Sequence, residues 1–422
     1  MTALSLFLGA ALLVQGPASG PAASPEADTL RLSGAVRAAL DANPMLRAAR
    51  LRADAAQQRI PQAGALPDPD LSLGLMNRMT SDLGSTMDPM TMNQVQFMQM
   101  LPWPGKLGFA KDRAARLAEA ERLDADDVEL MLVAQVKSVY SQLAYMDRAL
   151  VIMGSSRGLL RDFVQVSQAM YSVGTGLQQD VLQANVGVAR MTEDITVMAQ
   201  ERVAMAARLN ALLGREATVP VGALELARPD SVLPSVDSLV SVALARRPKL
   251  RAAQERAAAA TFAYRQARRE LFPDFTLGLA YGQRPRFDNM ASLMLGIRVP
   301  LWARSRQLPM RKEMQAMAAM ADAEARDTYN ETLARLVELR AEATRSLNLS
   351  RLYATEIVPQ AQASVDAALS AYRVGRVNYM TLVENQMLVN RYQTESVRLL
   401  AAYHTAVAEI EALVGGDLGG GQ

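Results

Sequence analysis

The segment Pro69-Asp70-Leu71-Ser72-Leu73-Gly74-Leu75 recurs 204 residues later as Pro273-Asp274-Phe275-Thr276-Leu277-Gly278-Leu279. In both copies apolar side chains alternate with small or polar ones, which is the period-two pattern of a strand whose sheet has two different faces. Proline can begin such a strand because the first residue need not donate to the ladder. A second alternating run follows each copy, so we predict β-hairpins at about 69–77 with 92–101 and at about 273–282 with 291–300.

Two further landmarks repeat in the same order. Pro44 aligns with Pro248 at the same offset, and Tyr171-Ser172-Val173-Gly174 aligns with Tyr372-Arg373-Val374-Gly375 at an offset of 201. Matched landmarks in one order indicate two copies of one structural unit. We predict a first repeat over 25–219, a linker or equatorial segment over 220–235, a second repeat over 236–415 and a disordered tail over 416–422.

Long helical segments flank the hairpins. Ala- and Arg-rich stretches at about 32–65 and 237–270 precede them, and after the first hairpin apolar residues recur every three or four positions, as at Val128, Leu132, Val136, Val139 and Leu143. This spacing makes a narrow apolar seam of the coiled-coil type. We predict long helices at about 105–170, 177–213, 303–371 and 378–414. At 1.5 Å per residue the first is roughly 100 Å long, so these rods project from the rest of the molecule.

An apolar run at residues 4–14 is followed by small residues up to Ser24. The run is long enough for the core of a signal peptide and shorter than the ~20 residues of a membrane-spanning helix. We therefore predict an approximate signal peptide at residues 1–24, and hence export.

Composition excludes several functional classes. The chain has 45 basic and 43 acidic residues, so it lacks the basic excess that binds nucleic acid. It has no cysteine and one histidine, His404, which excludes disulfides, thiolate chemistry and Cys/His zinc sites. The acid pair Asp126-Asp127 is interpreted as a solvated helix face. No catalytic triad or phosphate-binding glycine loop is recognisable, so no enzyme activity, cofactor or metal site is expected.

Each returning strand ends at prolines next to a tryptophan, Trp103 or Trp302. Tryptophan at a strand end fits a membrane-interface girdle, although an ordinary buried tryptophan would read the same way. Four short strands cannot close a barrel, since the smallest outer-membrane barrels use about eight, and open edges are not tolerated in lipid. Several identical chains must then share one barrel, in a number that this reasoning does not fix.

The order of helix, β-hairpin and long helical hairpin, repeated twice, resembles the TolC family of outer-membrane factors. The pattern from Leu32 to Asn43-Pro44, the segment from Gln62 to Pro69 and the paired Tyr-x-Val-Gly turns are typical of that family. The resemblance covers essentially the whole mature chain. It implies a mostly α fold with membrane β, in which a homotrimer forms a twelve-stranded β-barrel in outer-membrane lipid and a twelve-helix α-barrel in the periplasm.

The resemblance also implies partners and sites. A periplasmic adaptor would dock at the helix-hairpin tips, in series with an inner-membrane pump of the resistance-nodulation-division type. The tip residues are Val173, Gly174, Thr175, Gly176 and Leu177 in the first repeat, and Val374, Gly375, Arg376, Val377 and Asn378 in the second. Glycine permits the positive φ of such tight turns.

Acidic residues just past the tips ring the aperture in this family. Asp180 and Glu384 match, while Thr381 stands where an acid is common, so the ring is weaker here. Rings of carboxylates favour cations in pores. The alternative is that these residues are ordinary charges on solvated helices.

The expected function is a passive exit channel, with heavy-metal cations as the expected cargo. Pro102-Trp103-Pro104-Gly105-Lys106 resembles a segment common in the heavy-metal branch of the family, and thioethers among the 24 methionines could bind soft ions. The helical spacing of Met310, Met314 and Met317 fits ordinary gap filling equally well. Multidrug or solvent efflux and type I secretion remain alternatives. A soluble periplasmic coiled-coil adaptor is the alternative of another class, although adaptors carry one helical hairpin.

Overall fold

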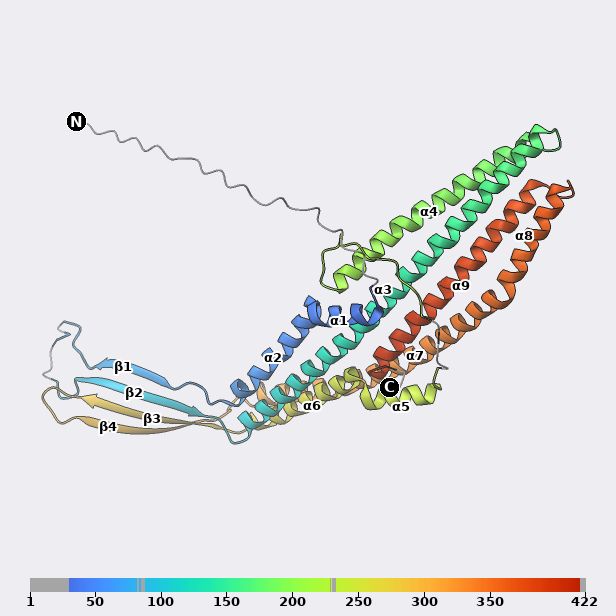
Figure 1. Ribbon diagram of the computed structural model, residues 1–422. Coiled ribbons are helices and arrows are strands. Elements are labelled where there is room, and N and C mark those ends of the chain that lie inside the picture. The colour runs from blue at the N-terminus through green and yellow to red at the C-terminus, as the bar shows by residue number, and fades with distance from the viewer. Residues whose placement is uncertain (1–29, 82, 85–87, 228, 230–232, 418–422) are drawn as a thin grey trace, which may run out of the picture.

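The computed structural model describes residues 30–417, apart from 82, 85–87, 228 and 230–232. The predicted signal peptide and the last five residues of the predicted tail lie outside this range. The molecule is elongated, with a β-sheet at one end and two long helical hairpins that run to the opposite end (Figure 1). Among the described residues, no helix combines the length and the apolar character needed to cross a lipid bilayer.

The two predicted hairpins form one sheet. The strands are β1 (Asp70–Met76), β2 (Met92–Leu101), β3 (Asp274–Gln283) and β4 (Met290–Arg298), in the order β1-β2-β3-β4 with every neighbouring pair antiparallel. The pairing of β2 with β3, in which Val95 lies opposite Tyr281, was not predicted. It joins the two repeats within one chain and leaves β1 and β4 as the edges.

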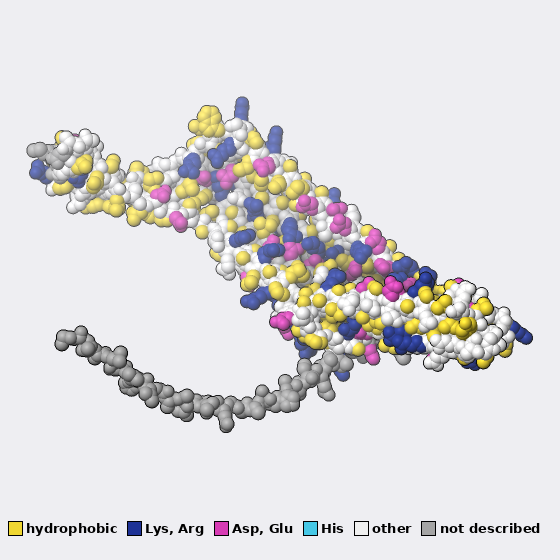
Figure 2. Space-filling model, turned by 90° about the horizontal axis from the view of Figure 1, so that it is seen from above, with side chains coloured by type: hydrophobic (Ala, Val, Ile, Leu, Met, Phe, Trp, Pro, Cys, Tyr) yellow, Lys and Arg dark blue, Asp and Glu magenta, His cyan; other side chains and the backbone are white. Residues whose placement is uncertain are grey.

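The register gives this sheet two unlike faces. Directly opposed residues share a face, so the pairs Leu73–Val95 and Leu277–Leu295 lie on one side, which we call the apolar face. Leu73 is 79% exposed and Leu295 78% exposed. The other side, the inner face, carries Ser, Thr, Gln, Gly and Met residues. Figure 2 shows that charged side chains gather over the helical body, whereas most of the sheet shows hydrophobic side chains and backbone.

The helices before each hairpin break at proline. The predicted helix at about 32–65 is two helices, α1 (Leu32–Ala42) and α2 (Pro44–Gly64), and that at about 237–270 is α5 (Val236–Arg246) and α6 (Pro248–Arg269). The residue before a proline is disfavoured in the helical region. Accordingly Asn43 and Arg247 have ψ angles of 121° and 117°. The Asn43 side chain accepts hydrogen bonds from the Met45 and Leu46 amides and so caps α2.

The first helical hairpin consists of α3 (Lys106–Ser172) and α4 (Gln178–Leu212). The second differs from the prediction of a single helix over about 303–371. It begins at Gln307 as α7 (Gln307–Leu352), passes through one π-helical turn, η1 (Tyr353–Ile357), and continues as α8 (Val358–Arg373) before returning as α9 (Tyr379–Val414). Pro359 explains the interruption, because its ring would clash with the carbonyl of Thr355 in a regular α-helix.

The segment between the repeats is tied to the rods by polar contacts. Arg202 of α4 forms an ion pair with Asp147 of α3 and donates to the carbonyls of Val221 and Gly222 at 3.0 Å. The Leu224 amide donates to Asp147 at 2.9 Å. Arg202 interrupts the apolar spacing of its helix because it holds this segment. His404 of α9 also contacts the segment, at the Ala227 carbonyl.

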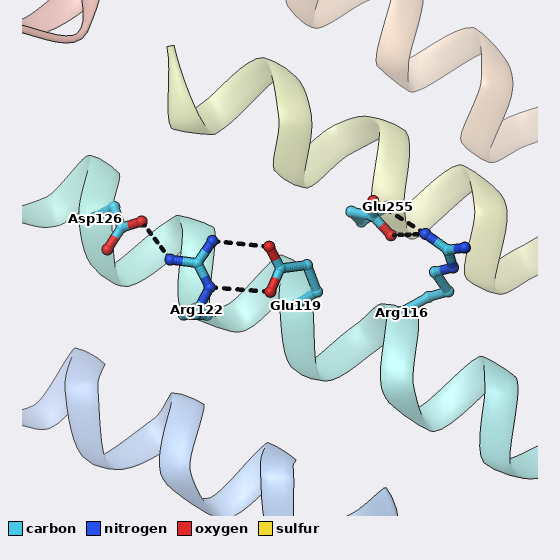
Figure 3. A network of polar contacts seen from close by, with 5 residues as sticks. All are labelled: Arg116, Glu119, Arg122, Asp126 and Glu255. Carbon is cyan, nitrogen blue, oxygen red and sulfur yellow. Dashed lines mark hydrogen bonds and ion pairs between the residues drawn. The ribbon is translucent and has the colours of Figure 1, made fainter. Parts of the chain in front are cut away.

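Ion pairs join the repeats along α3. Arg116 of α3 pairs with Glu255 of α6 at 3.0 Å and so joins the two repeats, whereas within α3 Arg122 pairs with Glu119 at 2.7 Å and with Asp126 at 2.9 Å (Figure 3). Exposed pairs of this kind contribute little to stability, so Asp126 is part of a solvated face as predicted. The prediction for Asp127 is wrong: this residue is largely buried next to Arg247, and burial raises the pKa of its carboxyl.

Candidate functional site

Both helix-hairpin tips are tight turns with exposed apolar side chains. Gly174 and Gly375 have φ angles of 77° and 70°, which favour glycine. A side chain on Gly176 would meet the Tyr171 amide nitrogen at 3.0 Å, so this turn also excludes larger residues. The residues directly before Gly174 and Gly375 are exposed valines: Val173 is 72% exposed and Val374 is 68% exposed. Exposed apolar residues grouped at the end of a rod favour contact with a partner.

Asn378 and Thr381 have a structural role in the second tip. The Asn378 side chain accepts hydrogen bonds from the Thr381 amide at 3.0 Å and from the Thr381 hydroxyl at 2.8 Å. This is an N-cap, which starts α9 immediately after the turn. Thr381, predicted to line the aperture, therefore uses its hydroxyl group within the tip.

The two tips are held together by a buried aromatic cluster that the sequence analysis missed. Tyr372 at the end of α8 and Tyr379 at the start of α9 are buried and meet edge to face, with ring centroids 5.7 Å apart. Phe163 of α3 and Ala184 of α4 belong to the same apolar cluster. Only one signal was available, the Tyr-x-Val-Gly motif. It does not distinguish buried Tyr372 from its counterpart Tyr171, which is 49% exposed.

Asp180 lies within interaction range of this cluster. It is partly buried in the first turn of α4, and its carboxylate faces the Tyr372 hydroxyl of the second hairpin. Burial, together with the Asp180 charge, raises the pKa of Tyr372 to about 12. Burial also raises the pKa of Tyr379, with smaller effects of Tyr372 and Asp180. Neither tyrosine hydroxyl has a hydrogen-bond partner among the described residues, so Asp180 acts on Tyr372 mainly through its charge. We call the Asp180–Tyr372 contact the latch.

Glu384, the other predicted acid, is exposed on α9. Asp180 and Glu384 therefore differ in kind: one faces a tyrosine across the two hairpins, and the other is free to face solvent. Whether they form a ring depends on neighbouring copies, so the ring stays a prediction.

The two tryptophans at the sheet–helix junction also differ in their surroundings. The Trp103 ring stacks on Phe272 and Phe275, with centroids 5.1 and 5.7 Å away, and its backbone amide donates to Asp274 at 2.8 Å. Trp302 is 77% exposed. Only Trp302 is open to solvent in one copy of the chain, and the girdle role of both residues stays a prediction.

The latch predicts a pH dependence. The closed arrangement favours the neutral phenol, whose pKa is raised to about 12, whereas a Tyr372 freed by separation of the tips would titrate near its ordinary value of 10.0. Raising the pH from 10 towards 12 therefore favours the separated tips. If the chain is the exit channel expected from its sequence, the current through the reconstituted protein should stay low up to pH 10 and rise above it. In a Tyr372→Phe variant the remaining alkaline rise should be smaller; an unchanged rise would contradict this assignment.

Comparisons with known proteins agree with this geometry. The sequence profile of the outer membrane efflux protein family matches residues 35–215 and 239–416. The pyoverdine export outer membrane protein OpmQ of Pseudomonas putida is 27% identical over 93% of this chain and 87% of its own length. The OpmQ protein of Pseudomonas aeruginosa is 27% identical over 74% of this chain and 67% of its own length.

Solved structures share the fold. The outer membrane protein VceC of Vibrio cholerae superimposes with a TM-score of 0.79 at 18% identity, covering 92% of this chain and 96% of VceC. The outer-membrane channel OprN gives 0.77 at 20% identity, over 91% and 90% of the two chains. CusC gives 0.76 at 15% identity, over 92% and 93%. At these identities the likeness is one of fold.

Proposed function

Because this chain belongs to the outer membrane efflux protein family, we propose that it is the passive exit channel of a tripartite efflux system. The family places it in the outer membrane, with its helices extending into the periplasm. The observation that carries the proposal is the pairing of a sheet, whose exposed apolar face suits lipid, with helical rods whose far ends pack together on one buried apolar cluster.

The unpaired edges of β1 and β4 support a shared barrel. An open edge is not tolerated in lipid, and three copies, as the TolC resemblance implies, supply twelve strands. The apolar face would meet lipid and the inner face would line the pore.

The repeat also predicts how neighbouring copies pair. Leu71 corresponds to Phe275 and Phe97 to Ile297, because each pair occupies the same place in its hairpin. Within the chain, Phe97 of β2 faces Leu279 of β3. If the same rule joins β4 to β1 of the next copy, Ile297 faces Leu75 there.

The tips are the proposed docking surface for a periplasmic adaptor, which would connect the channel to an inner-membrane pump. Their exposed valines and leucine lie at the end farthest from the sheet (Figure 1). The family assignment removes the alternative that the chain is itself a soluble adaptor.

For the cargo, two classes are proposed. Small organic molecules are supported by the relatives named for pyoverdine export. The Pro-x-Pro-Gly-Lys segment is weaker evidence for metal than expected, because its residues have structural roles. Gly105 is the N-cap of α3 with φ 93°, and Lys106 forms buried ion pairs with Glu270 and Asp274, at 3.0 and 2.8 Å. No group of three or more His, Asp or Glu side chains suited to a metal ion occurs among the described residues. Soft metal ions are the second class, on the observation developed in the next subsection.

Purified protein in a planar bilayer tests the proposal. We expect discrete conductance steps and recovery from cells only with detergent. Recovery in the soluble periplasmic extract would refute it, as would the absence of any conductance step in the bilayer at every protein concentration. Accumulation of a siderophore, a dye and silver in a deletion strain would then identify the cargo.

A further inference from the structure

All six methionines in the four strands lie on one face of the sheet. They are Met76, Met92, Met98, Met100, Met290 and Met294, and the register places every one on the inner face. The apolar face carries Leu, Val, Ile, Phe and Tyr but no methionine within these strands. A methionine that served only as an apolar filler would be as suitable on the lipid side. The segregation therefore associates the thioethers with the polar side chains of the proposed pore.

Glycines on the inner face allow these side chains to converge. Gly278 of β3 lies between Met98 of β2 and Met294 of β4 in one row across the sheet. A Cβ atom at Gly278 would lie 3.6 Å from Met98 Cγ and 3.2 Å from Met294 Cε, so both side chains lean over the bare backbone from opposite sides. The Met98 and Met294 side chains form a thioether pair.

Two further methionines lie nearer the turns of the sheet, with their sulfur atoms over different strands, β1 and β3. Met76 of β1 is directly opposite Met92 of β2. Both sulfur atoms again lie over glycines: Met76 Sδ is 3.5 Å from the Cβ position of Gly74, and Met92 Sδ is 2.6 Å from that of Gly282. Any larger residue at Gly282 would displace the Met92 sulfur.

The surroundings of these four methionines are neutral and rich in sulfur. The only charged residues on the inner face of the strands are Asp70, Asp274 and Arg298, which stand at the strand ends next to the helices. Arg298 donates to Met100 Sδ at 3.5 Å, so Met100 is already engaged. Gln96 donates to Met98 Sδ at 3.0 Å, which leaves that sulfur one further lone pair. Hard divalent ions find few oxygen ligands here, whereas soft ions find sulfur.

We propose that the Met98–Met294 pair, and the single thioethers of Met76 and Met92, bind soft monovalent metal ions, Ag(I) or Cu(I), as they pass through the channel. Two neutral thioethers are soft ligands of the kind that such ions prefer. Several weak sites in series suit a conducting path, because an ion must bind to enter and must also leave. The inference rests on one part of the proposed function, namely that the inner face of the sheet lines the pore.

Titration calorimetry of the purified, full-length channel with Ag(I) tests the inference. We expect the wild type to bind Ag(I), and the double variant Met98→Leu/Met294→Leu to lose about tenfold in affinity or one class of sites. Leucine keeps the volume of methionine, so the sheet should be preserved. A double variant at the exposed α7 positions, Met317→Leu/Met320→Leu, is the matched control and should bind as the wild type does.

A second variant tests the placement of the methionine side chains without changing their number. Gly278→Val keeps every methionine but inserts a side chain between Met98 and Met294, and valine suits a strand. We expect the same loss of affinity. Equal Ag(I) binding by all variants, or none by the wild type, overturns the inference. Transport of organic dyes that changes in the leucine variants without any Ag(I) binding would also overturn it, in favour of an adaptable lining for organic cargo. Bilayer conductance of the same preparations tests the channel function separately.

Discussion

Replacing Asp180 with alanine is expected to raise the current through the reconstituted channel about tenfold or more. The Tyr372 hydroxyl faces this carboxylate across the two helical hairpins. The Asp180 charge acts on the buried Tyr372 side chain, and loss of an interaction of about 1.4 kcal/mol changes the ratio of open to closed channels by about tenfold. Planar-bilayer currents at neutral pH measure the effect.

Two further variants isolate the latch. Tyr372→Phe keeps the ring in the aromatic cluster but removes the hydroxyl, so it should raise the current as Asp180→Ala does. The double variant should add little, because both changes remove one interaction. Glu193→Gln neutralises an exposed acid on the same helix and should leave the current unchanged. Equal increases in Glu193→Gln and Asp180→Ala would show that overall charge, and not the latch, sets the current.

The second large effect is expected at the apolar face. Leu295→Arg should abolish assembly in the outer membrane, because arginine at the lipid face of a barrel costs about 2–4 kcal/mol near the bilayer midplane and the cost recurs in every copy. Ser292→Arg, in the same strand but on the inner face, is the matched control and should assemble. Heat-modifiable oligomers in detergent extracts of outer membranes report the outcome. If both variants assemble equally, the faces have been assigned to the wrong environments.

The sequence predicted the sheet well because its period was unambiguous. The alternation at Leu71, Leu73 and Leu75 can place these residues on only one face, and the repeat supplied an independent second reading. The pairing of β2 with β3 could not be predicted in the same way, since nothing in either hairpin specifies which neighbour its edge will meet.

The presence of the helices was easier to predict than the residues at which they begin, break and end. Apolar spacing indicates a helix but is insensitive to local backbone strain, so the breaks before Pro44 and Pro248 and the π-helical turn before Pro359 were missed although each follows from proline chemistry. Asp127 was misread for a related reason. Its environment is created by Arg247, 120 positions away in the chain, which no local pattern reveals.

For the site, the tips could be located but not their internal contacts. Glycine at 174 and 375 marks a turn in any sequence, whereas the burial of Tyr372 against Tyr379 depends on two hairpins meeting. Likewise the methionines stood out in the composition, but only the strand register shows that they share one face.

The central claim is that copies of the chain join their sheets edge to edge, and engineered cysteines test it most directly. The natural chain has no cysteine, so Leu75→Cys/Ile297→Cys introduces the only two thiols. Within one copy, β1 and β4 are separated by three strand spacings, roughly 14 Å, which is beyond the reach of a disulfide.

Oxidation of this variant in outer membranes should give covalent dimers and a closed trimer on denaturing gels, and no larger species. The pair Leu71→Cys/Leu293→Cys lies on the same edges but about eight residues out of the expected register, and should remain monomeric. Monomers alone from Leu75→Cys/Ile297→Cys, or equal cross-linking by both pairs, would contradict the account.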